Sequence, residues 1–500
     1  MLNQDKHLSD YPELEAYMKK IGFEDEDTID LKSLYEEGIA NYTVMNKEQK
    51  SIVDTVTAKL QDTTDKNRYI YVDGIGGSGK SYTFNTIRKL AMGKGFKVII
   101  MAWSGIAASL YPMGRTCHNA FKLEFPFESD SNSGVKPNSS HGKMLEEADI
   151  IIWDEFPMAP KRALEVVDSK LREIMGKDIP FGGKILLCGG DFRQCAPIIE
   201  NGTVEEIIGI SVCCSHLWKQ FQKFQLIENV RALPHENEFK KMLVEIGEGR
   251  FGENPNEIKI PEEWMSKGDI IDEIFGDVME NYDPATVMKR AILATWNKDV
   301  DDLNEQVLDL LDEETEVTYH AQDVYHYGDE ILQAAGEIHQ NYKTKNIKGL
   351  PSYRLRLRKN AIVMLIRNLS IEDGLCNGTR LVVTNLLKHN LVVKKINIDG
   401  SLSDEILIPR ISLTAKHGVV DVTRHQFPVK LGFCMTINKS QGQTMDKVGV
   451  VLKHECFSHG QLYVAFSRVR STEGLKVVLP EDKTSTANIV YKRLLELGKK

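Results

Sequence analysis

The chain has 500 residues, too many for one ordinary hydrophobic core, so we expect two or three domains. Hydrophobic residues make up 42% and charged residues 27%, values typical of soluble globular domains, which argues against a disordered or fibrous chain. The formal net charge of −9 provides no overall positive field for nucleic acid or an anionic membrane, so any polyanion site must be a local groove.

Cysteine usage and the N-terminal segment indicate a reducing compartment. The eight cysteines include no CxxC pair, and in the close group Cys213, Cys214 and His216 adjacent cysteines make a poor chelate, so we expect reduced thiols. The start MLNQDKHLSDYPELEAYMKK lacks the patterns of a signal or transit peptide, and the longest apolar region, from Lys97 to Met113, is shorter than a membrane span. We expect a nuclear or cytoplasmic protein without a transmembrane segment.

The predicted elements begin with an acidic, weakly periodic stretch over residues 1–40, which we expect to be a small appendage. Over residues 41–225, the apolar runs YIYVDG, KVIIMAW, ADIIIWDE and KILLCGGD alternate with helical stretches. Such runs are typical of a parallel sheet with helices on both faces, and they predict an α/β domain. A polar segment rich in Ser, Asn, Pro and Gly predicts a small insertion at about 120–145.

A second α/β unit begins with RAILATWN, and we assign to it residues 226–318 and 420–500. Between its two parts, residues 319–419 contain short apolar runs separated by turn residues. This texture predicts a small β-rich insertion in the second domain.

The segment DGIGGSGKSYTF, from Asp73 to Phe84, matches the pattern G-x4-G-K-[ST] between an apolar strand and a helical stretch. Glycines without Cβ atoms let backbone N–H groups surround phosphates, the lysine reaches the β and γ oxygens, and the serine hydroxyl binds Mg²⁺. The expected ligands are therefore ATP and Mg²⁺. The expected phosphate-binding residues are Gly74, Gly76, Gly77, Ser78, Gly79, Lys80 and Ser81.

Two further apolar runs bring acidic and amide groups toward the same edge of the predicted sheet. ADIIIWDEFPM ends on Asp154, expected to hold Mg²⁺ through water, and on Glu155, expected to activate the attacking water. An N-cap role for Asp154 before the helix near Pro160 is the alternative. KILLCGGDFRQ brings Gln194 to the same edge, within reach of the γ-phosphate.

These motifs, with NKEQKSIVD before the P-loop, resemble superfamily 1B helicases, specifically the petite-integration-frequency (PIF) family and the related helicase of Helitron transposons. The segments LWKQFQKFQLIENVRA, LATWNKDVDDLNEQVL, RHQFPVKLGFCMTINKSQGQT and LYVAFSRVRS extend the resemblance over about residues 46–471. It implies two RecA-like P-loop core domains with an SH3-like β-barrel insertion in the second. It also implies an ATP-dependent DNA helicase of 5′-to-3′ polarity that acts in replication, repair or recombination.

The resemblance also assigns roles around the nucleotide. Gln49 matches the glutamine that recognises adenine, and Arg231 and Arg468 match arginines that reach ATP from the second core domain. Guanidinium groups in such positions stabilise charge on the phosphoryl group. Gly442 and Gln443, in KSQGQT, are expected near the same cleft.

For DNA, the resemblance places a single strand across both core domains. Hydroxyl, amide and backbone N–H groups bind phosphates without reading sequence. The expected DNA contacts are Ser104, Gly105, Thr116, His118, Thr436, Lys439, Ser440 and Gln441. A buried, hydrogen-bonded histidine is the alternative for His118.

Two features near these positions allow more than one interpretation. Phe121, Phe125 and Phe127 can supply the wedge that parts the duplex, although their spacing also suits a core. The run YRLRLRK, at residues 353–359, predicts a positive strand face, either solvated or tracking a DNA strand.

The expected partners are single-stranded DNA and forked or tailed duplex DNA, bound by a monomer that needs no membrane. Three other functions fit the same motifs: a P-loop ATPase acting on protein, an RNA helicase, and a transposon remnant that keeps a DNA-stimulated ATPase without unwinding activity.

Overall fold

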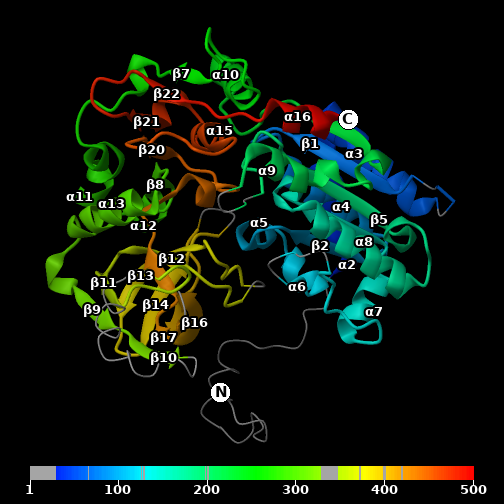
Figure 1. Cartoon of the computed structure of the whole chain (residues 1–500), viewed down its shortest axis with the longest axis horizontal. Coiled ribbons are helices and arrows are strands. Elements are labelled where there is room, and N and C mark those ends of the chain that lie inside the picture. The colour runs from blue at the N-terminus through cyan, green and yellow to red at the C-terminus, as the bar shows by residue number, and fades with distance from the viewer. Residues whose placement is uncertain are drawn as a thin grey trace, which may run out of the picture.

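The computed structural model of the chain describes residues 30–62, 64–65, 67–124, 127, 130–197, 199, 202–327, 347–370, 373–397, 401–417 and 420–500. Two α/β bodies lie side by side, and a β-rich body lies below the second in the view of Figure 1. Within these ranges, no helix combines the length and apolar character that crossing a membrane requires.

The first body is built on a sheet of six parallel strands. In spatial order they are β3 (Arg115–Thr116), β2 (Val98–Ala102), β4 (Ile150–Asp154), β5 (Ile185–Gly190), β1 (Tyr69–Gly74) and β6 (Gln222–Leu226). Its helices are α2 (Leu31–Val44), α3 (Lys47–Gln61), α4 (Lys80–Gly93), α5 (Gly105–Ser109), α6 (Cys117–Phe121), α7 (Ser140–Glu147), α8 (Lys161–Met175) and α9 (Val204–Ile210).

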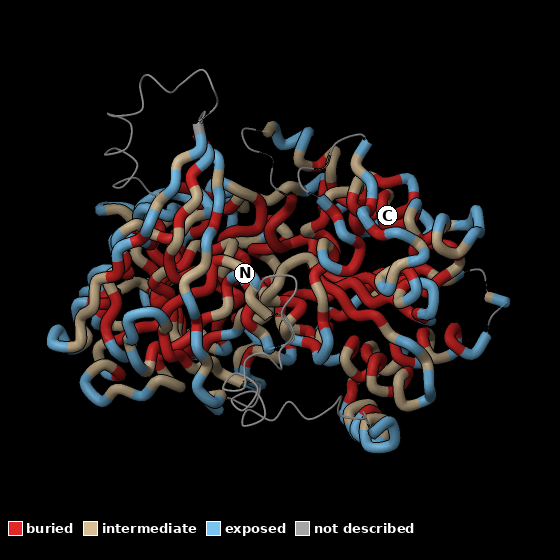
Figure 2. The backbone as a smooth tube through the Cα atoms, turned by 90° about the horizontal axis from the view of Figure 1, so that it is seen from below, coloured by how far each residue is buried: buried red, intermediate tan, exposed pale blue. Residues whose placement is uncertain are grey.

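Helices cover both faces of this sheet, which explains why its strands are apolar without alternation. Successive residues of β1 enter different cores: Tyr71 packs in the cluster that contains Val167 of α8, and Val72 packs in the cluster that contains Val56 of α3 and Ile87 of α4. Figure 2 shows buried backbone running through the interior beneath a more exposed surface. The expected α/β layer is confirmed.

Helix α2 crosses the expected boundary at residue 40. It packs on α4 so closely that a Cβ at Gly38 would lie 2.9 Å from Leu90, and one at Gly93 would lie 2.5 Å from Tyr35. The first domain therefore includes residues from Leu31 onward, while residues 1–29 of the expected appendage lie outside the described residues.

The second body has a four-stranded parallel sheet of β19 (Cys434–Thr436), β8 (Arg290–Ala294), β20 (Lys447–Val451) and β21 (Leu475–Val478). An antiparallel pair, β7 (Glu257–Lys259) and β22 (Ser485–Ala487), lies beside it. The helices that follow Leu226 are α10 (Asn237–Gly247), α11 (Asp277–Glu280), α12 (Pro284–Val287), α13 (Asn297–Asp309), α15 (Gln461–Phe466) and α16 (Lys492–Lys499). Both bodies are thus α/β domains with parallel sheets, as expected for two RecA-like domains.

The C-terminal helix departs from the expected division, because α16 packs on the first body. Leu494 joins the first-domain core, and Trp218 Nε1 donates a hydrogen bond to Leu497 O at 3.1 Å. Lys223 Nζ donates to Lys500 O at 2.8 Å. The assignment of all of residues 420–500 to the second domain is therefore wrong at its end: the chain crosses back and ties the two bodies together.

The β-rich insertion, which we define as residues 317–431, contains three antiparallel groups of strands. They are β9 (Val317–His320) with β11 (Arg354–Leu357), then β10 (Gln322–Tyr327), β17 (Val420–Gln426) and β16 (Ile411–His417), and finally β15 (Ile406–Pro409), β14 (Asn390–Lys395), β13 (Arg380–Leu386), β12 (Ile362–Leu365) and β18 (Val429–Leu431). Because β17 and β18 pair only with these strands, the insertion ends at Leu431 and not at 419. The SH3-like barrel stays a prediction.

Candidate functional site

The P-loop joins β1 to α4 and forms a tight cradle. Gly77 and Gly79 have φ values of +85° and +77°, the left-handed region that favours glycine. A Cβ at Gly77 would lie 2.5 Å from Cβ of Arg231 and 2.8 Å from Oδ1 of Asn229. The buried Ser78 Oγ has no hydrogen-bond partner among the described residues. A closely approached backbone with an unsatisfied hydroxyl fits a phosphate ligand.

A cavity of about 320 Å³ lies over this cradle and is shared by the two α/β bodies. Most of the residues that the sequence predicts for ATP binding line this cavity. The lining includes Gly76, Gly77, Ser78, Gly79, Lys80, Ser81, Glu155, Gln194, Arg231, Gly442 and Arg468. Gly74 is the last residue of β1, directly below the cradle.

The expected Mg²⁺ ligands lie close together at the end of β4. Ser81 Oγ donates a hydrogen bond to Asp154 Oδ2 at 3.1 Å, and Lys80 Nζ lies 4.0 Å from Asp154 Oδ1. A hydroxyl and a carboxylate are oxygen ligands of the kind that Mg²⁺ prefers, so this pair fits the ion. Since α8 begins at Lys161 with Pro160 as its N-cap, the alternative N-cap role of Asp154 is wrong.

Tyr111 completes this acidic site and was missed by sequence reasoning. Its hydroxyl donates to Asp154 Oδ2 at 2.5 Å, which orients the carboxylate. The tyrosine lies in SGIAASLYPM, where no motif marks it. Only the fold, which brings the turn after α5 to the end of β4, places its hydroxyl here.

Glu155 has the environment of a proton acceptor that titrates near neutral pH. Its φ of +53° is unusual for a residue other than glycine and directs the buried side chain into the cleft. Burial, together with the charge of Asp154 and against the opposing charges of Lys80 and Arg468, raises the pKa of its carboxyl to about 7. A carboxyl so tuned suits general-base chemistry.

The two predicted arginines meet over the P-loop. Arg231 Nη1 donates to Ser467 O at 2.9 Å, and Arg468 donates through Nη1 to Gln443 O at 2.9 Å and through Nε to Val464 O at 2.8 Å. Burial and, to a smaller extent, the charge of Arg468 lower the pKa of Arg231 to about 9. Arg468 is buried and Arg231 is half-buried, and two guanidinium groups that repel each other favour an anion in the cavity between them.

Side-chain bonds also close the cleft between the domains. Gly76 N donates to Tyr463 Oη at 2.8 Å, and the same hydroxyl donates to Asp191 Oδ2 at 2.8 Å. Gln441 Nε2 donates to Gln194 Oε1 at 2.8 Å. Tyr463 of α15 therefore links the P-loop of one domain to the helix that precedes Arg468 in the other. The segment LYVAFSRVRS contains this tyrosine, but the sequence does not indicate its role.

Gln49 lies beside the P-loop, as expected. It forms a capping box with Asn46 at the start of α3, and its Nε2 donates to Ser78 O at 3.2 Å. Its recognition of adenine stays a prediction.

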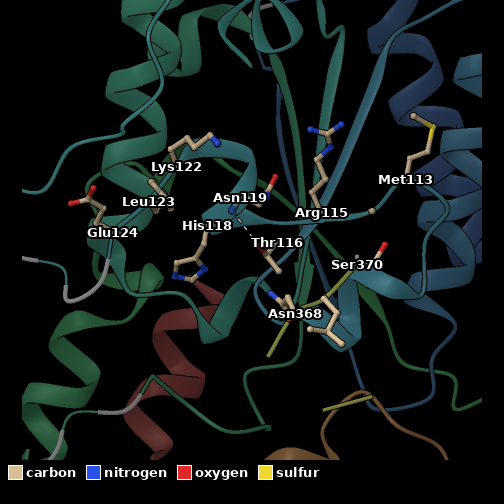
Figure 3. Close-up of a pocket in the computed structure, with 12 residues that line it drawn as sticks. Met113, Arg115, Thr116, His118, Asn119, Lys122, Leu123, Glu124, Asn368 and Ser370 are labelled. Carbon is tan, nitrogen blue, oxygen red and sulfur yellow. Dashed lines mark hydrogen bonds between the residues drawn. The ribbon is translucent and has the colours of Figure 1, made fainter. Parts of the chain in front are cut away.

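A second cavity, of about 760 Å³, lies between the first domain and the β-rich insertion (Figure 3). Its lining includes the predicted Thr116 and His118, and basic and amide groups that sequence reasoning missed. These are Arg115, Asn119, Lys122 and Asn368. The Thr116 hydroxyl accepts a hydrogen bond from Asn119 N and so caps α6. The half-buried His118 packs against Trp103, with ring centroids 4.6 Å apart, and burial lowers its pKa.

The other predicted DNA contacts of the first domain lie at the start of α5. Ser104 is its N-cap, and Gly105 contacts the insertion so closely that a Cβ would lie 2.8 Å from Cys376 Cβ. The backbone of this turn therefore faces the insertion across the interface.

The predicted contacts of the second domain divide between two places. Thr436 ends β19, and Lys439 follows in a short 3₁₀ helix, where burial and the charge of Lys430 lower the pKa of its amino group to about 8. Ser440 is fully buried and donates to Ile437 O at 2.7 Å, so its hydroxyl is not available to DNA, contrary to expectation. Gln441 reaches the nucleotide cleft through its bond to Gln194.

The structure describes two of the three phenylalanines proposed as a duplex-parting wedge. Phe121 is fully buried in the first-domain core, so the expectation that it parts a duplex is wrong. Phe127 is partly buried and stacks on Trp103, and Phe125 lies outside the described residues.

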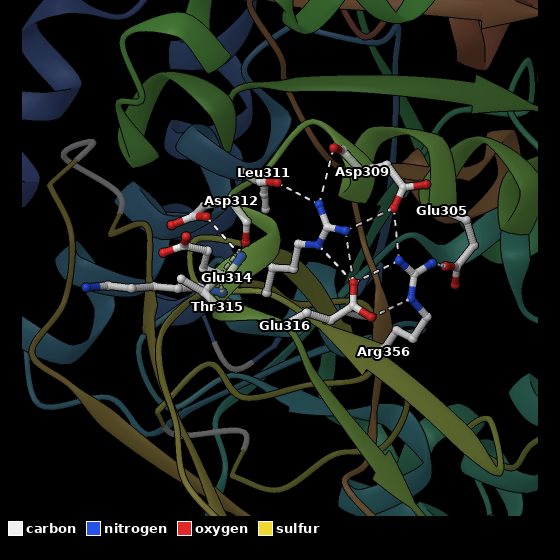
Figure 4. Close-up of polar contacts among 10 residues, drawn as sticks. Glu305, Asp309, Leu311, Asp312, Glu314, Thr315, Glu316 and Arg356 are labelled. Carbon is white, nitrogen blue, oxygen red and sulfur yellow. Dashed lines mark hydrogen bonds and ion pairs between the residues drawn. The ribbon is translucent and has the colours of Figure 1, made fainter.

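In the basic strand 353–359, Arg356 and Arg358 are held in ion pairs, while Arg354 is exposed. Arg356 forms ion pairs with Glu305, Asp309 and Glu316, at 2.8, 2.9 and 2.9 Å (Figure 4). Arg358 pairs with Glu316 at 2.9 Å and donates to the backbone carbonyls of Asp309 and Leu311 at the end of α13. These two arginines hold the insertion on the second core domain.

No metal cluster forms at the cysteines. All eight are free thiols, and within the described ranges no three His, Cys, Asp or Glu side chains gather as a metal-binding group would.

Two parallel-sheet domains that close over one P-loop, one acidic pair and two arginines define a P-loop nucleoside triphosphatase with paired core domains. Comparison with protein families makes this more specific. The model of the PIF1-like helicase family matches residues 44–257, and that of the DNA helicase Pif1 2B domain matches residues 343–386. The chain belongs to the PIF1-like helicase family.

Known relatives agree with this assignment. The chain is 27% identical over 455 residues to the ATP-dependent DNA helicase PIF1 of Xenopus laevis, covering 89% of this chain but only 63% of that protein. It is 26% identical over 427 residues to the ATP-dependent DNA helicase Pif1 of Bdellovibrio bacteriovorus, covering 84% of this chain and 86% of the relative.

Solved structures share the fold. Pif1 helicase from Bacteroides in complex with ADP-AlF3 and ssDNA matches with a TM-score of 0.68 and 23% identity, over 91% of this chain and 97% of that one. Pif1 helicase from Candida albicans matches with a TM-score of 0.67 and 23% identity, over 91% and 98% of the two chains.

Proposed function

We propose that this protein is an ATP-dependent DNA helicase that moves 5′ to 3′ along single-stranded DNA and parts the duplex ahead of it. The observation that carries the proposal is the nucleotide cavity, which takes its P-loop from one core domain and Arg468 from the other. Because both domains line the cavity, a change in the charge of its occupant changes how firmly they hold together.

The charged and phosphate-binding residues of the cavity have distinct roles in hydrolysis. The P-loop amides and Lys80 bind the phosphates, and Glu155 accepts a proton from the attacking water. Ser81 and Asp154 would hold Mg²⁺, which when bound neutralises phosphate charge. Arg231 and Arg468 then stabilise the charge on the transferring group, and loss of the γ-phosphate weakens their hold.

Single-stranded DNA is the substrate that the second cavity favours. Arg115 and Lys122 supply positive charge, and Thr116 and Asn368 supply neutral polar groups that bind phosphates without reading sequence. The polarity and a role in replication, repair or recombination are supported by family resemblance, whereas the nuclear or cytoplasmic location and the monomeric state are expectations from the sequence. Mg²⁺ as cofactor and forked or tailed duplexes as substrates belong to the same proposal.

The test is ATP hydrolysis measured with no nucleic acid, with single-stranded DNA and with RNA of the same sequence. We expect DNA to stimulate hydrolysis several-fold more than RNA, and Lys80→Ala to abolish it. Lys89→Ala is the matched control, since Lys89 lies on the same helix but pairs with Glu37 at 2.7 Å, away from the cavity. Hydrolysis unaffected by DNA would favour an ATPase that acts on protein, and stronger stimulation by RNA would favour an RNA helicase.

A further inference from the structure

Two large aromatic side chains stand exposed together on the second core domain. Among the exposed large hydrophobic side chains of the described residues, Trp296 is the sole tryptophan, at 53% exposure, and Phe457 the sole phenylalanine, at 57%. Their ring centroids lie 5.9 Å apart, and the ring of His454 lies 5.5 Å from that of Trp296. Large apolar rings gathered at one exposed place form the kind of patch that marks a binding surface.

The cluster lies at the carboxyl edge of the second sheet. Trp296 follows β8 and Phe457 follows β20, which are adjacent parallel strands (Figure 1). On the other side of β8, β19 ends at Thr436 and leads to Lys439. The aromatic rings therefore share one edge with the residues proposed to contact DNA.

Hydrogen bonds fix the cluster to that edge. Phe457 N donates to Gln461 Oε1 at 2.9 Å, and Gln461 Nε2 donates to Asn438 Oδ1 at 3.1 Å, next to Lys439 in the chain. Thr295 Oγ1 donates to His454 O at 3.0 Å, which holds the other loop. Hydrogen bonds to the second core domain thus hold in place the two loops that carry the rings.

The charges around the rings suit a polyanion. Lys298 and Lys453 are exposed beside the two aromatic residues in the chain. Among the nearby acids, Glu455 is paired with Lys483 at 2.7 Å and Asp299 faces His454 at 3.9 Å, while Asp301 and Asp302 lie further along α13. Flat aromatic faces flanked by cations are the combination that binds unpaired bases and their phosphates.

We propose that Trp296 and Phe457 form a stacking platform for unpaired bases of single-stranded DNA. The inference rests on the proposed function, because it assumes that a strand crosses this edge. The platform binds the base and not the phosphate. It therefore accepts any DNA sequence but does not bind a strand that lacks bases.

The test compares binding to an oligo(dT) and to an abasic oligonucleotide of the same length, both labelled with fluorescein. Since loss of a stacked base contact weakens binding about tenfold, we expect that loss for Trp296→Ala and Phe457→Ala with oligo(dT) and almost none with the abasic strand. Leu310→Ala is the matched control, because Leu310 is also exposed and caps the other end of α13. Equal weakening on both oligonucleotides, or none on oligo(dT), would overturn the platform, and the latter would leave the surface to a protein partner.

Intrinsic fluorescence gives a second readout. Three of the five tryptophans, Trp153, Trp218 and Trp264, are at most 2% exposed and Trp103 is partly buried, so Trp296 is the one that a base can reach directly. We expect oligo(dT) to quench the wild-type emission, and Trp296→Phe to lose the quenching while keeping its affinity within about threefold, because phenylalanine also stacks. Undiminished quenching in Trp296→Phe would contradict the proposal. If wild-type protein binds neither oligonucleotide, the proposed function fails; if it binds both and the variants match it, only the platform fails.

Discussion

Replacing Glu155 by glutamine is expected to abolish ATP hydrolysis and, at alkaline pH, to stabilise the protein. Burial raises the pKa of the Glu155 carboxyl to about 7, whereas in the unfolded chain it ionises at its ordinary value. A raised carboxyl pKa means that stability is greatest below the unfolded pKa and is lost as the pH rises through about 7. The loss is about 3 kcal/mol at pH 8.5, from the free energy that corresponds to such a displacement. Glutamine keeps the shape of the side chain and never ionises.

The assay is thermal unfolding of wild-type protein and Glu155→Gln at pH 4.5 and pH 8.5. At pH 8.5 the variant should unfold roughly 6 to 12 °C higher, if the first domain responds like others of its size, and at pH 4.5 the two should nearly coincide. The exposed Glu205→Gln is the control and should match the wild type in both stability and hydrolysis. Equal midpoints at pH 8.5, or hydrolysis retained in Glu155→Gln, would refute the assignment of Glu155 as a buried general base.

Further measurements, on the wild-type protein and on three variants, test other parts of the structure. For wild-type protein, kcat/KM for ATP should rise as the pH increases from 6 to 8, since Glu155 must be ionised to accept a proton, and a flat profile would count against it. Tyr463→Phe removes both bonds of the hydroxyl and should lower the free energy of unfolding by about 2 kcal/mol, measured with urea; an unchanged value would deny the link between the domains. Gly77→Ala should abolish binding of a fluorescent ATP analogue, because its Cβ would meet Arg231 at 2.5 Å. Arg358→Met should make the β-rich insertion more sensitive to protease while ATP binding persists, whereas wild-type resistance would show that the ion pairs do not hold it.

The features that sequence predicted well are those that a short segment specifies by itself. The apolar run YIYVDG has to be buried on both faces, and the P-loop that follows it carries its function in its own glycines, lysine and serine. Asp154 and Glu155 follow another such strand, so the parallel sheet brings them to the P-loop without further information.

The features that sequence missed depend on distant segments. The bond of Tyr463 to Gly76 spans residues far apart in the chain, and its hydroxyl is marked by no local pattern. The basic strand that contains Arg356 looked positive only because its partners, Glu305 and Asp309, lie on a helix of the neighbouring domain. Similarly, α16 returns to the first domain by binding Trp218, and nothing in the sequence of α16 indicates that contact.

Strand displacement tests the central claim most directly, on duplexes that carry either a 5′ or a 3′ single-stranded overhang. The account predicts ATP-dependent unwinding of the 5′-tailed duplex, little unwinding of the 3′-tailed one, and none of either by Lys80→Ala. Unwinding from the 3′ tail alone would contradict the proposed polarity, and ATP hydrolysis stimulated by DNA without any displacement would contradict the claim that closing the cleft over the P-loop drives the opening of a duplex.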